Sequence, residues 1–356
     1  MAALFEFLTG KRMVPMKDLG PIECALSMNI QVDRLNGLLK ISNTPYIETV
    51  LERFGMTDCS PAKTPMVEEQ LSPMDWPTLA SEKERMQKLP FRQLLGCLWW
   101  VAWCTRPDIL VAVYECSKHV EHPSPKLWEA LKRILRYLKG TSDWGIVMQR
   151  EKLESGDLGL SLLLKDDFDH RQQNKADLET KAQNKKIKAY VDGDWASCLI
   201  DRHSRSGGLI YFLGQPVGWM CEMQSSIALS STESEFYGLV KIGKLVIWLH
   251  RLVSQLRYNI DGPVPVYCDN KSAIALSQKD HFPKRSKHFD VHSKIVQKWV
   301  RDDKIIDVVH LNTDDQPADC LTKPLQGEKF RKFRDYIMGE YALQTLFPCL
   351  TKKKST

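Results

Sequence analysis

The hydrophobic pattern changes its period near residue 188, and this change constrains the fold of the 356-residue chain more than any other feature. Before this point, apolar residues recur at the three- and four-residue spacing of amphipathic helices. After it, they alternate in short runs typical of strands. Residues 165–188 are polar and of mixed charge. Because the chain is long enough for two compact units, we interpret this segment as a linker or an exposed insertion between them.

The first 150 residues are predicted to be mainly helical. Residues 46–55 have an amphipathic pattern that closes on a glycine, residues 91–104 form an apolar helix, and Pro107 begins a third. Residues 125–140 carry an apolar stripe, made of Leu127, Leu131, Ile134, Leu135 and Leu138. This stripe predicts a helix with a core face. Its basic rim is either a solvated surface or a track for a nucleic-acid backbone, and consists of Lys132, Arg133, Arg136 and Lys139.

The region after residue 188 is predicted to be an α/β domain of roughly 140 residues, which is an ordinary domain size. The expected order is strand, strand, strand, helix, strand and helix, at 188–192, 208–213, 217–223, 230–252, 264–268 and from 271 onward. We expect the last residues, 351–356, to form a frayed tail.

Four acidic residues of this second region occupy element ends or apolar faces, where an isolated charge is costly. They are Asp192, Glu235, Asp269 and Asp319. Asp192 ends the first strand, and Asp269 follows the apolar run 264–268 at the strand edge where α/β folds usually bind ligands. Glu235 shares a helical face with Leu239 and Ile242. Since the four acids lie on separate elements, they could converge on one site.

Each acid also has a purely structural alternative. Asp269 could cap the following helix, Thr232 and Glu235 could form a capping box, and Asp319 could favour the first turn of a helix. Asp192 could be a turn acid beside Gly193. Only the joint pattern favours a functional site.

Composition limits the class of protein without naming its function. Lys and Arg exceed Asp and Glu by 50 to 44, and the net charge of +6 permits a polyanionic partner without requiring one. The ten cysteines contain no Cys-x-x-Cys pair, and no secretory-signal pattern is present, which favours reduced thiols over disulfides or zinc. The longest apolar run, 94–104, is shorter than the ~20 residues that span a bilayer. We therefore expect an intracellular protein without a membrane segment.

Six short motifs follow one another in the second region, at 190–196, 201–208, 228–237, 267–274, 287–290 and 318–325. In this order they closely resemble the RNase H region of copia-type LTR retrotransposon Pol polyproteins. Four motifs of the first half, at 16–20, 52–56, 105–109 and 136–141, resemble the end of the same polyprotein's reverse transcriptase. The resemblance covers nearly all of residues 13–326.

The resemblance implies a division of the chain into four parts. Residues 1–150 would be a thumb- or connection-like remnant of reverse transcriptase, 151–187 a linker or insertion, 188–328 the RNase H-like domain, and 329–356 a C-terminal tail. The implied fold class is α/β, with an RNase H-like mixed β-sheet flanked by helices behind a mainly helical region.

The resemblance also implies a site. The metal-binding carboxylates of the family fall on Asp192, Glu235, Asp269 and Asp319. Glu233 is a competing acid, but the family pattern Glu-aromatic-x-x-Leu selects Glu235 and leaves Glu233 to cap Ser230. His310 is the candidate for the mobile histidine used near product release, with an ordinary surface histidine as the alternative.

Four crowded carboxylates repel one another unless cations neutralise them. Hard oxygen ligands select Mg²⁺, with Mn²⁺ as a substitute, and two such ions about 3.5 to 4 Å apart can activate a water without a covalent nucleophile. The implied reaction is endonucleolytic hydrolysis of the RNA strand of an RNA:DNA hybrid. The hybrid would be recognised by its 2′-hydroxyls and groove shape.

Two basic segments are candidates for contacts with the hybrid. Residues 279–288 supply Lys284, Arg285, Lys287 and His288, and the turn after the first strand supplies Arg202 and Arg205. Either segment could be a solvated loop. The first departs from the family wording His-Ser-Arg-Thr-Lys-His-Ile by losing the leading histidine from its register.

DNA synthesis is not expected. A polymerase needs a Tyr-x-Asp-Asp turn and a further palm aspartate, and neither precedes residues 16–20; residues 190–194 only mimic the turn, with Gly193 between the acids. The alternative function is a catalytically inactive or repurposed nucleic-acid-binding protein. An integrase or transposase is disfavoured because it needs the order Asp, Asp, Glu. Other expected partners are retrotransposon proteins or a separate polymerase palm, in cytoplasmic retrotransposon particles or the nucleus.

Overall fold

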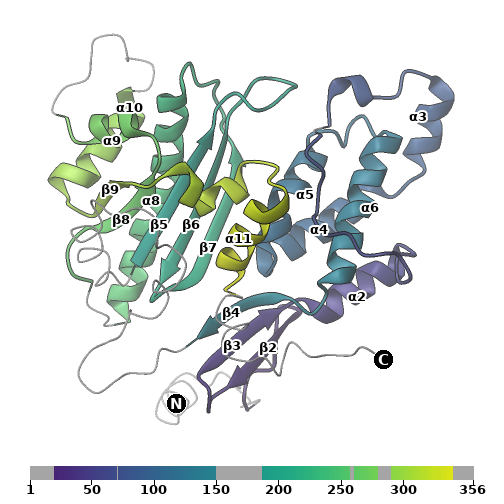
Figure 1. The fold of residues 1–356 in the computed structure, drawn as a ribbon, viewed down its shortest axis with the longest axis horizontal. Coiled ribbons are helices and arrows are strands. Elements are labelled where there is room, and N and C mark those ends of the chain that lie inside the picture. Colours follow the sequence, from purple (N-terminus) through teal and green to yellow (C-terminus); the bar gives the residue numbers. More distant parts are fainter. Residues whose placement is uncertain (1–19, 70, 150–186, 257–259, 280–289, 340–356) are drawn as a thin grey trace, which may run out of the picture.

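The computed structural model describes residues 20–69, 71–149, 187–256, 260–279 and 290–339. Two separate sheets with their helices make up this part of the chain (Figure 1). The segment predicted to be a linker or insertion, 151–187, lies outside the described residues except for Ile187. The division of the chain into domains therefore stays a prediction.

The first half contains the helices that the hydrophobic pattern predicted and one further helix, α3 (Ala80–Gln87), that was not predicted. They are α2 (Thr44–Arg53), α3 (Ala80–Gln87), α4 (Phe91–Cys104), α5 (Leu110–Ser117) and α6 (Pro125–Gly140), with short 3₁₀ turns η1 (Pro73–Asp75) and η2 (Pro107–Ile109). The apolar stripe of α6 is buried throughout, as predicted. Ser124 caps this helix by accepting a hydrogen bond from the backbone N–H of Leu127 at 3.1 Å.

The first half also contains a small antiparallel sheet that was not predicted. Its order is β1 (Cys24–Ala25), β2 (Met28–Asp33), β3 (Leu38–Ser42) and β4 (Gly145–Gln149). β3 pairs with β4 across about a hundred intervening residues, so that Ser42 lies opposite Gly145. Strands this short and partly exposed carry little pattern of their own, because their pairing depends on a distant segment.

The second sheet is mixed, as predicted. Its order is β7 (Gln215–Met223), β6 (Arg205–Phe212), β5 (Ile187–Asp194), β8 (Val264–Cys268) and β9 (Ile306–His310). β5, β6 and β7 run antiparallel, whereas β5, β8 and β9 are parallel. The strand β9 was not predicted.

Helices cover both faces of this sheet. They are α8 (Ser231–Gln255), α9 (Lys271–Ser277), α10 (Asp290–Gln297) and α11 (Gly327–Met338), with the short turns η4 (Lys298–Asp302), η5 (Thr313–Asp315) and η6 (Pro317–Leu321). Val191 and Val266 pack on the α8 side. The prediction that residues 329–356 form a tail is wrong for the start of that segment, because Phe330, Phe333 and Ile337 of α11 are buried.

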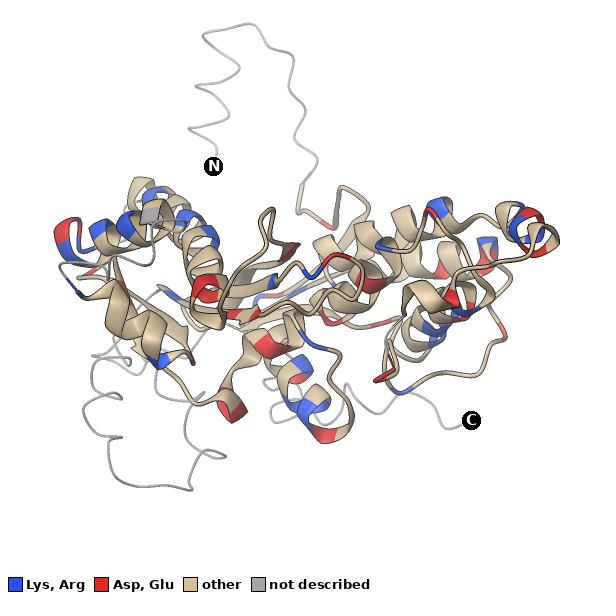
Figure 2. Cartoon of the chain, turned by 90° about the horizontal axis from the view of Figure 1, so that it is seen from above, with Lys and Arg blue, Asp and Glu red and all other residues tan. Residues whose placement is uncertain are grey.

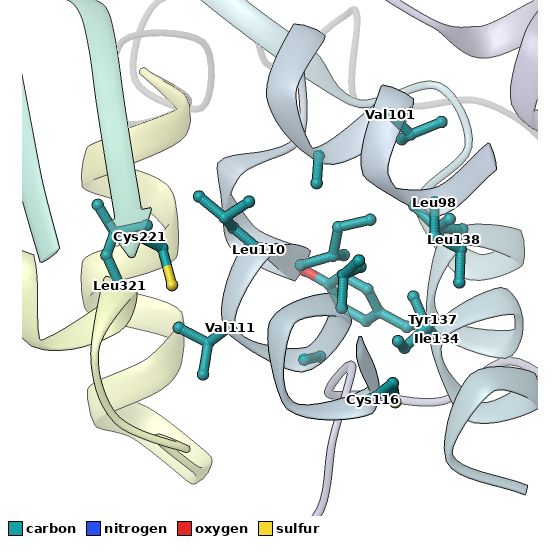
Figure 3. Packing of buried hydrophobic residues seen from close by; sticks show 14 of the residues in the cluster. Leu98, Val101, Leu110, Val111, Cys116, Ile134, Tyr137, Leu138, Cys221 and Leu321 are labelled. Atoms are coloured by element: carbon teal, nitrogen blue, oxygen red, sulfur yellow. The ribbon is translucent and has the colours of Figure 1, made fainter. Parts of the chain in front are cut away.

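The opposite face of the sheet shares a core with the first half of the chain. Leu110 and Val111 of α5 belong to one buried cluster with Cys221 of β7 and Leu321 of η6, and Figure 3 shows these side chains pointing toward one another. The indole Nε1 of Trp219 donates a hydrogen bond to the carbonyl oxygen of Ala102 at 3.2 Å. The helical region is therefore packed against the sheet.

Candidate active site

Asp192 lies near the end of β5, the central strand of the mixed sheet, and its side chain is buried. The hydroxyl Oγ1 of Thr322 donates a hydrogen bond to Asp192 Oδ2. The ammonium Nζ of Lys323 lies 3.3 Å from the same oxygen. A buried carboxylate is tolerated only with such partners, and both partners come from the chain that follows η6.

Glu235 lies in the first turns of α8, where backbone contacts fix its position. Ser230 caps the helix by accepting from the N–H of Glu233 at 3.2 Å, and the Glu233 carboxylate accepts from the N–H of Leu229 at 2.8 Å. Glu233 is therefore the acid at the start of the helix, as predicted, although its carboxylate accepts from Leu229 rather than from the predicted Ser230. Because Ser230 is the N-cap, a capping box between Thr232 and Glu235 is excluded. Gly193 of β5 permits the start of α8 to pack closely against the strand, because a Cβ at residue 193 would lie 3.1 Å from the backbone nitrogen of Glu235.

Asp269 directly follows β8 and is half-buried. It does not cap α9, because the side chain of Asn270 accepts the hydrogen bond from the N–H of Ala273 at 3.0 Å. Thr313 Oγ1 donates to Asp269 Oδ2 at 2.8 Å. Ligand atoms of Asp269, Glu235 and Cys268 lie within 4.8 Å of one another.

Asp319 lies in the first turn of η6 and is buried. Gln316, the residue before η6, ties this turn to the sheet by donating to the carbonyl of Val191 at 3.0 Å. Both carboxylate oxygens of Asp319 are ion-paired: Lys323 Nζ lies 2.8 Å from Oδ1, and Lys329 Nζ lies 3.0 Å from Oδ2. The sequence reasoning missed both lysines, although the spacing of Asp319 and Lys323 is that of an i,i+4 pair.

The electrostatics couple Asp192 and Glu235 to the other acids. Burial raises the pKa of Asp192 to about 6; Lys323 opposes this shift, and Asp319 and Asp269 add to it. Burial also raises the pKa of Glu235 well above its usual range, with further contributions from Asp192 and Asp269. Among the described residues, the one group of three possible ligand side chains within 4.8 Å of one another is Glu235, Cys268 and Asp269, so the assignment of all four acids to one metal site stays a prediction.

The donor set of this site fits a hard divalent cation. The four carboxylates lie on β5, in α8, directly after β8 and in η6, and repulsion between neighbouring carboxylates favours a bound cation. The thiol of Cys268 lies 3.7 Å from Glu235 Oε2, beside the same donors. Asp192, Glu235, Asp269 and Asp319 would hold Mg²⁺ or Mn²⁺. The ammonium of Lys323 supplies part of the neutralising charge in the structure itself.

No family model matches the chain. The Pol polyprotein of transposon TNT 1-94 from Nicotiana tabacum is 35% identical over 323 residues, which cover 90% of this chain and 22% of the relative. That of transposon RE2 from Arabidopsis thaliana is 30% identical over 306 residues, or 86% of this chain and 18% of the relative. The chain belongs to the Pol polyproteins of copia-type retrotransposons. It spans about a fifth of the length of these relatives.

Part of this Pol segment overlaps solved RNase H structures. Among solved structures, LC11-RNase H1 in complex with an RNA/DNA hybrid overlaps it with a TM-score of 0.30 and 16% identity, over 38% of this chain and 94% of that one. Within the described ranges of the Pol segment, no helix is both long and apolar enough to cross a bilayer.

The remaining predicted residues of the Pol segment have different outcomes. His310 ends β9 opposite Cys268, so its backbone lies at the same sheet edge as Asp269, and its role stays a prediction. Arg202 is exposed, and its contact with nucleic acid also stays a prediction. Four predicted contacts lie outside the described residues, namely Lys284, Arg285, Lys287 and His288.

The prediction that Arg205 contacts nucleic acid is wrong. Its side chain is buried, and its guanidinium pairs with Glu115 of α5. The residue is enclosed because α5 packs over this end of β6 and β7, which the sequence alone did not indicate.

The basic rim of α6 also has structural partners in the Pol segment. Arg133 donates to Thr64 Oγ1 at 2.9 Å, and Arg136 donates to the carbonyl of Ser60 at 2.8 Å. Lys132 pairs with Glu129 at 2.6 Å. Lys and Arg are interspersed with Asp and Glu over the described helices (Figure 2). These contacts favour the interpretation of the rim as a structural and solvated surface.

Proposed function

We propose that this Pol segment hydrolyses the RNA strand of RNA:DNA hybrids in the presence of Mg²⁺. What supports the proposal is the electrostatic coupling of Asp192 and Glu235 to Asp269 and Asp319, together with the close approach of Glu235 and Asp269. Burial and mutual repulsion raise the pKa of Asp192 and Glu235, and such shifts are typical of functional sites.

The carboxylates would hold the divalent cations, which supply an activated water and stabilise the departing oxygen of the cleaved strand. The protein's own contribution is to keep the four acids in place. Thr322 orients Asp192, the capping of α8 by Ser230 orients Glu235, and Gln316 anchors the turn that carries Asp319. Such preorganisation keeps the acids in register before the substrate arrives.

A nicking assay on a labelled RNA:DNA hybrid tests this function. We expect cleavage of the RNA strand with Mg²⁺, none with EDTA, and none for Asp192→Asn. Asp307→Asn is a matched control, because Asp307 is an exposed acid on β9 of the same sheet. Cleavage that survives both EDTA and Asp192→Asn would contradict the assignment.

A second candidate function is binding of nucleic acid without cleavage. The lysines favour it, because Lys323 and Lys329 already pair with both oxygens of Asp319. If the wild-type chain retains a labelled hybrid in a gel-shift assay but cleaves it with neither Mg²⁺ nor Mn²⁺, this second function is the correct one.

A further inference from the structure

A buried ion network joins the reverse-transcriptase part of the chain to the mixed sheet. Glu115 of α5 and Arg205, the first residue of β6, form an ion pair, with 5% and 2% of their side chains exposed. Lys118 Nζ lies 2.7 Å from the other oxygen of Glu115. Arg205 Cζ also lies 5.5 Å from the centre of the Tyr114 ring. The helix α5 therefore supplies both the counter-charge and the aromatic face that enclose Arg205.

The network continues from Arg205 to the carboxylate site. The second arm of the guanidinium, Nη1, donates to the carbonyl oxygen of Thr322 at 2.7 Å. The hydroxyl of the same threonine donates to Asp192 Oδ2. The next residue, Lys323, places its ammonium on Asp192 and Asp319. Thr322 thus accepts a hydrogen bond from Arg205 with its backbone carbonyl and orients Asp192 with its side-chain hydroxyl.

Packing leaves Thr322 little freedom to move independently of the sheet. A Cβ on Gly207 of β6 would lie 2.6 Å from the methyl Cγ2 of Thr322 and 3.0 Å from Cβ of Leu321. Because this close contact is possible only with glycine at residue 207, η6 and the residue that follows it pack tightly against β6. A displacement of Arg205 would therefore be transmitted to Thr322.

A buried guanidinium is stable only while its charge is paired. If Glu115 lost its charge, Arg205 would have to seek another acceptor or water, and its hydrogen bond to Thr322 would be weakened. Lysine cannot replace arginine here, because a single ammonium lacks the fork that reaches two acceptors at fixed geometry.

We propose that Glu115 is a positioning residue for the carboxylate site, so that the reverse-transcriptase part acts on Asp192 through Arg205 and Thr322. This inference rests on the proposed function, because it concerns the binding of divalent cations by the carboxylate site. It also assigns a role to the helical region beyond that of a scaffold.

The test uses the full chain and the variant Glu115→Gln, with Mn²⁺ binding measured by electron paramagnetic resonance at constant pH. We expect Mn²⁺ affinity to fall by up to about 10-fold, because Glu115 acts through Arg205 and Thr322, and removal of a direct hydrogen-bond partner of a metal ligand costs about 10- to 100-fold. Glu129→Gln is the control, because Glu129 pairs only at the exposed surface of α6. Unchanged Mn²⁺ affinity in a folded Glu115→Gln chain would overturn the proposal, even if its melting temperature fell.

Two further measurements separate positioning from a general loss of stability. In a Thr322→Val background, Glu115→Gln should cause no additional loss of Mn²⁺ affinity, because both changes interrupt the same connection. If the two losses instead multiply, Glu115 does not act through Thr322. Should Glu115→Gln fail to fold, Arg205→Lys is the second variant, and Mn²⁺ affinity equal to wild type there also overturns the proposal.

Hydrogen exchange on the metal-free chain keeps this inference separate from the proposed function. The N–H groups of Thr322 and Lys323 both donate to the carbonyl of Asp319, at 3.2 and 2.9 Å. We expect Glu115→Gln to accelerate exchange at these two amides. If the wild type neither binds Mn²⁺ nor cleaves a hybrid, the proposed function fails; if exchange at these amides is unchanged, the coupling fails.

Discussion

Lys323 lies between Asp192 and Asp319, with its ammonium nitrogen 3.3 Å from the first carboxylate and 2.8 Å from the second. The ammonium therefore occupies part of the space and supplies part of the charge that a divalent cation would contribute. A cation that binds both acids must displace it or share them with it. This relationship leads to the first prediction.

Replacement of Lys323 by methionine should destabilise the metal-free chain and increase its stabilisation by Mg²⁺. The metal-free site would hold four acids with less positive charge, whereas Mg²⁺ would no longer compete with the ammonium. Thermal melting with and without Mg²⁺ measures both effects. Lys88→Met is the control, because Lys88 pairs only with exposed Glu84. An equal Mg²⁺-induced shift in wild type and Lys323→Met would contradict the competition.

The raised pKa of Asp192 predicts a pH-dependent stability of the metal-free chain. Because its pKa rises from 3.8 to about 6 on folding, the folded state binds more protons than the unfolded state between these values. The free energy of unfolding should therefore fall as pH rises through this window, by on the order of 3 kcal/mol.

Urea unfolding at a series of pH values, compared with Asp192→Asn, measures the contribution of Asp192. The neutral amide cannot lose a proton, so the variant should lack this part of the decline. Asp307→Asn should follow the wild type. Parallel curves for wild type and Asp192→Asn across the window would show that Asp192 does not titrate in this way.

Gly193→Ala should impair the site more than the fold. The new Cβ would lie 2.9 Å from Ser234 Oγ and 3.1 Å from the nitrogen of Glu235, so α8 must move away from β5. We expect a loss of about 1 to 3 kcal/mol in stability and a large loss of hybrid cleavage. Gly218→Ala on β7 is the matched control, because an added Cβ there meets nothing within 4 Å. Equal cleavage by the two variants would refute this role of Gly193.

Asp108→Asn should destabilise the helical region strongly. Arg106 donates two hydrogen bonds to Asp108, at 2.9 and 2.8 Å, and Tyr137 donates a third at 2.7 Å. Because Arg106 is completely buried, the loss of its counter-charge should cost about 3 to 5 kcal/mol. The urea midpoint of unfolding measures this cost. The exposed Asp143 provides the control Asp143→Asn, and a midpoint shift no larger than that of the control would contradict the prediction.

Local spacing was sufficient to predict much of this molecule. The helices at 91–104 and 125–140 follow from the period of their apolar residues, since a helix buries the face that its own sequence makes apolar. The acids Asp192 and Asp269 were found because one lies at the end of a buried strand and the other directly follows one, where a charge lies near the edge of a sheet. Ordered motifs then selected Glu235 over Glu233.

Long-range partners decided the rest. Arg205 and Lys323 resemble surface cations in the sequence, and only packing shows that one is enclosed by Glu115 and the other is paired with Asp192. The strands β3 and β4 show little hydrophobic alternation in the sequence, because each is stabilised by hydrogen bonds to the other. Sequence by itself determined which residues prefer burial and which four acids match the motifs of the family. Tertiary structure decided how charges are neutralised, because a buried charge depends on partners that distant segments bring to it.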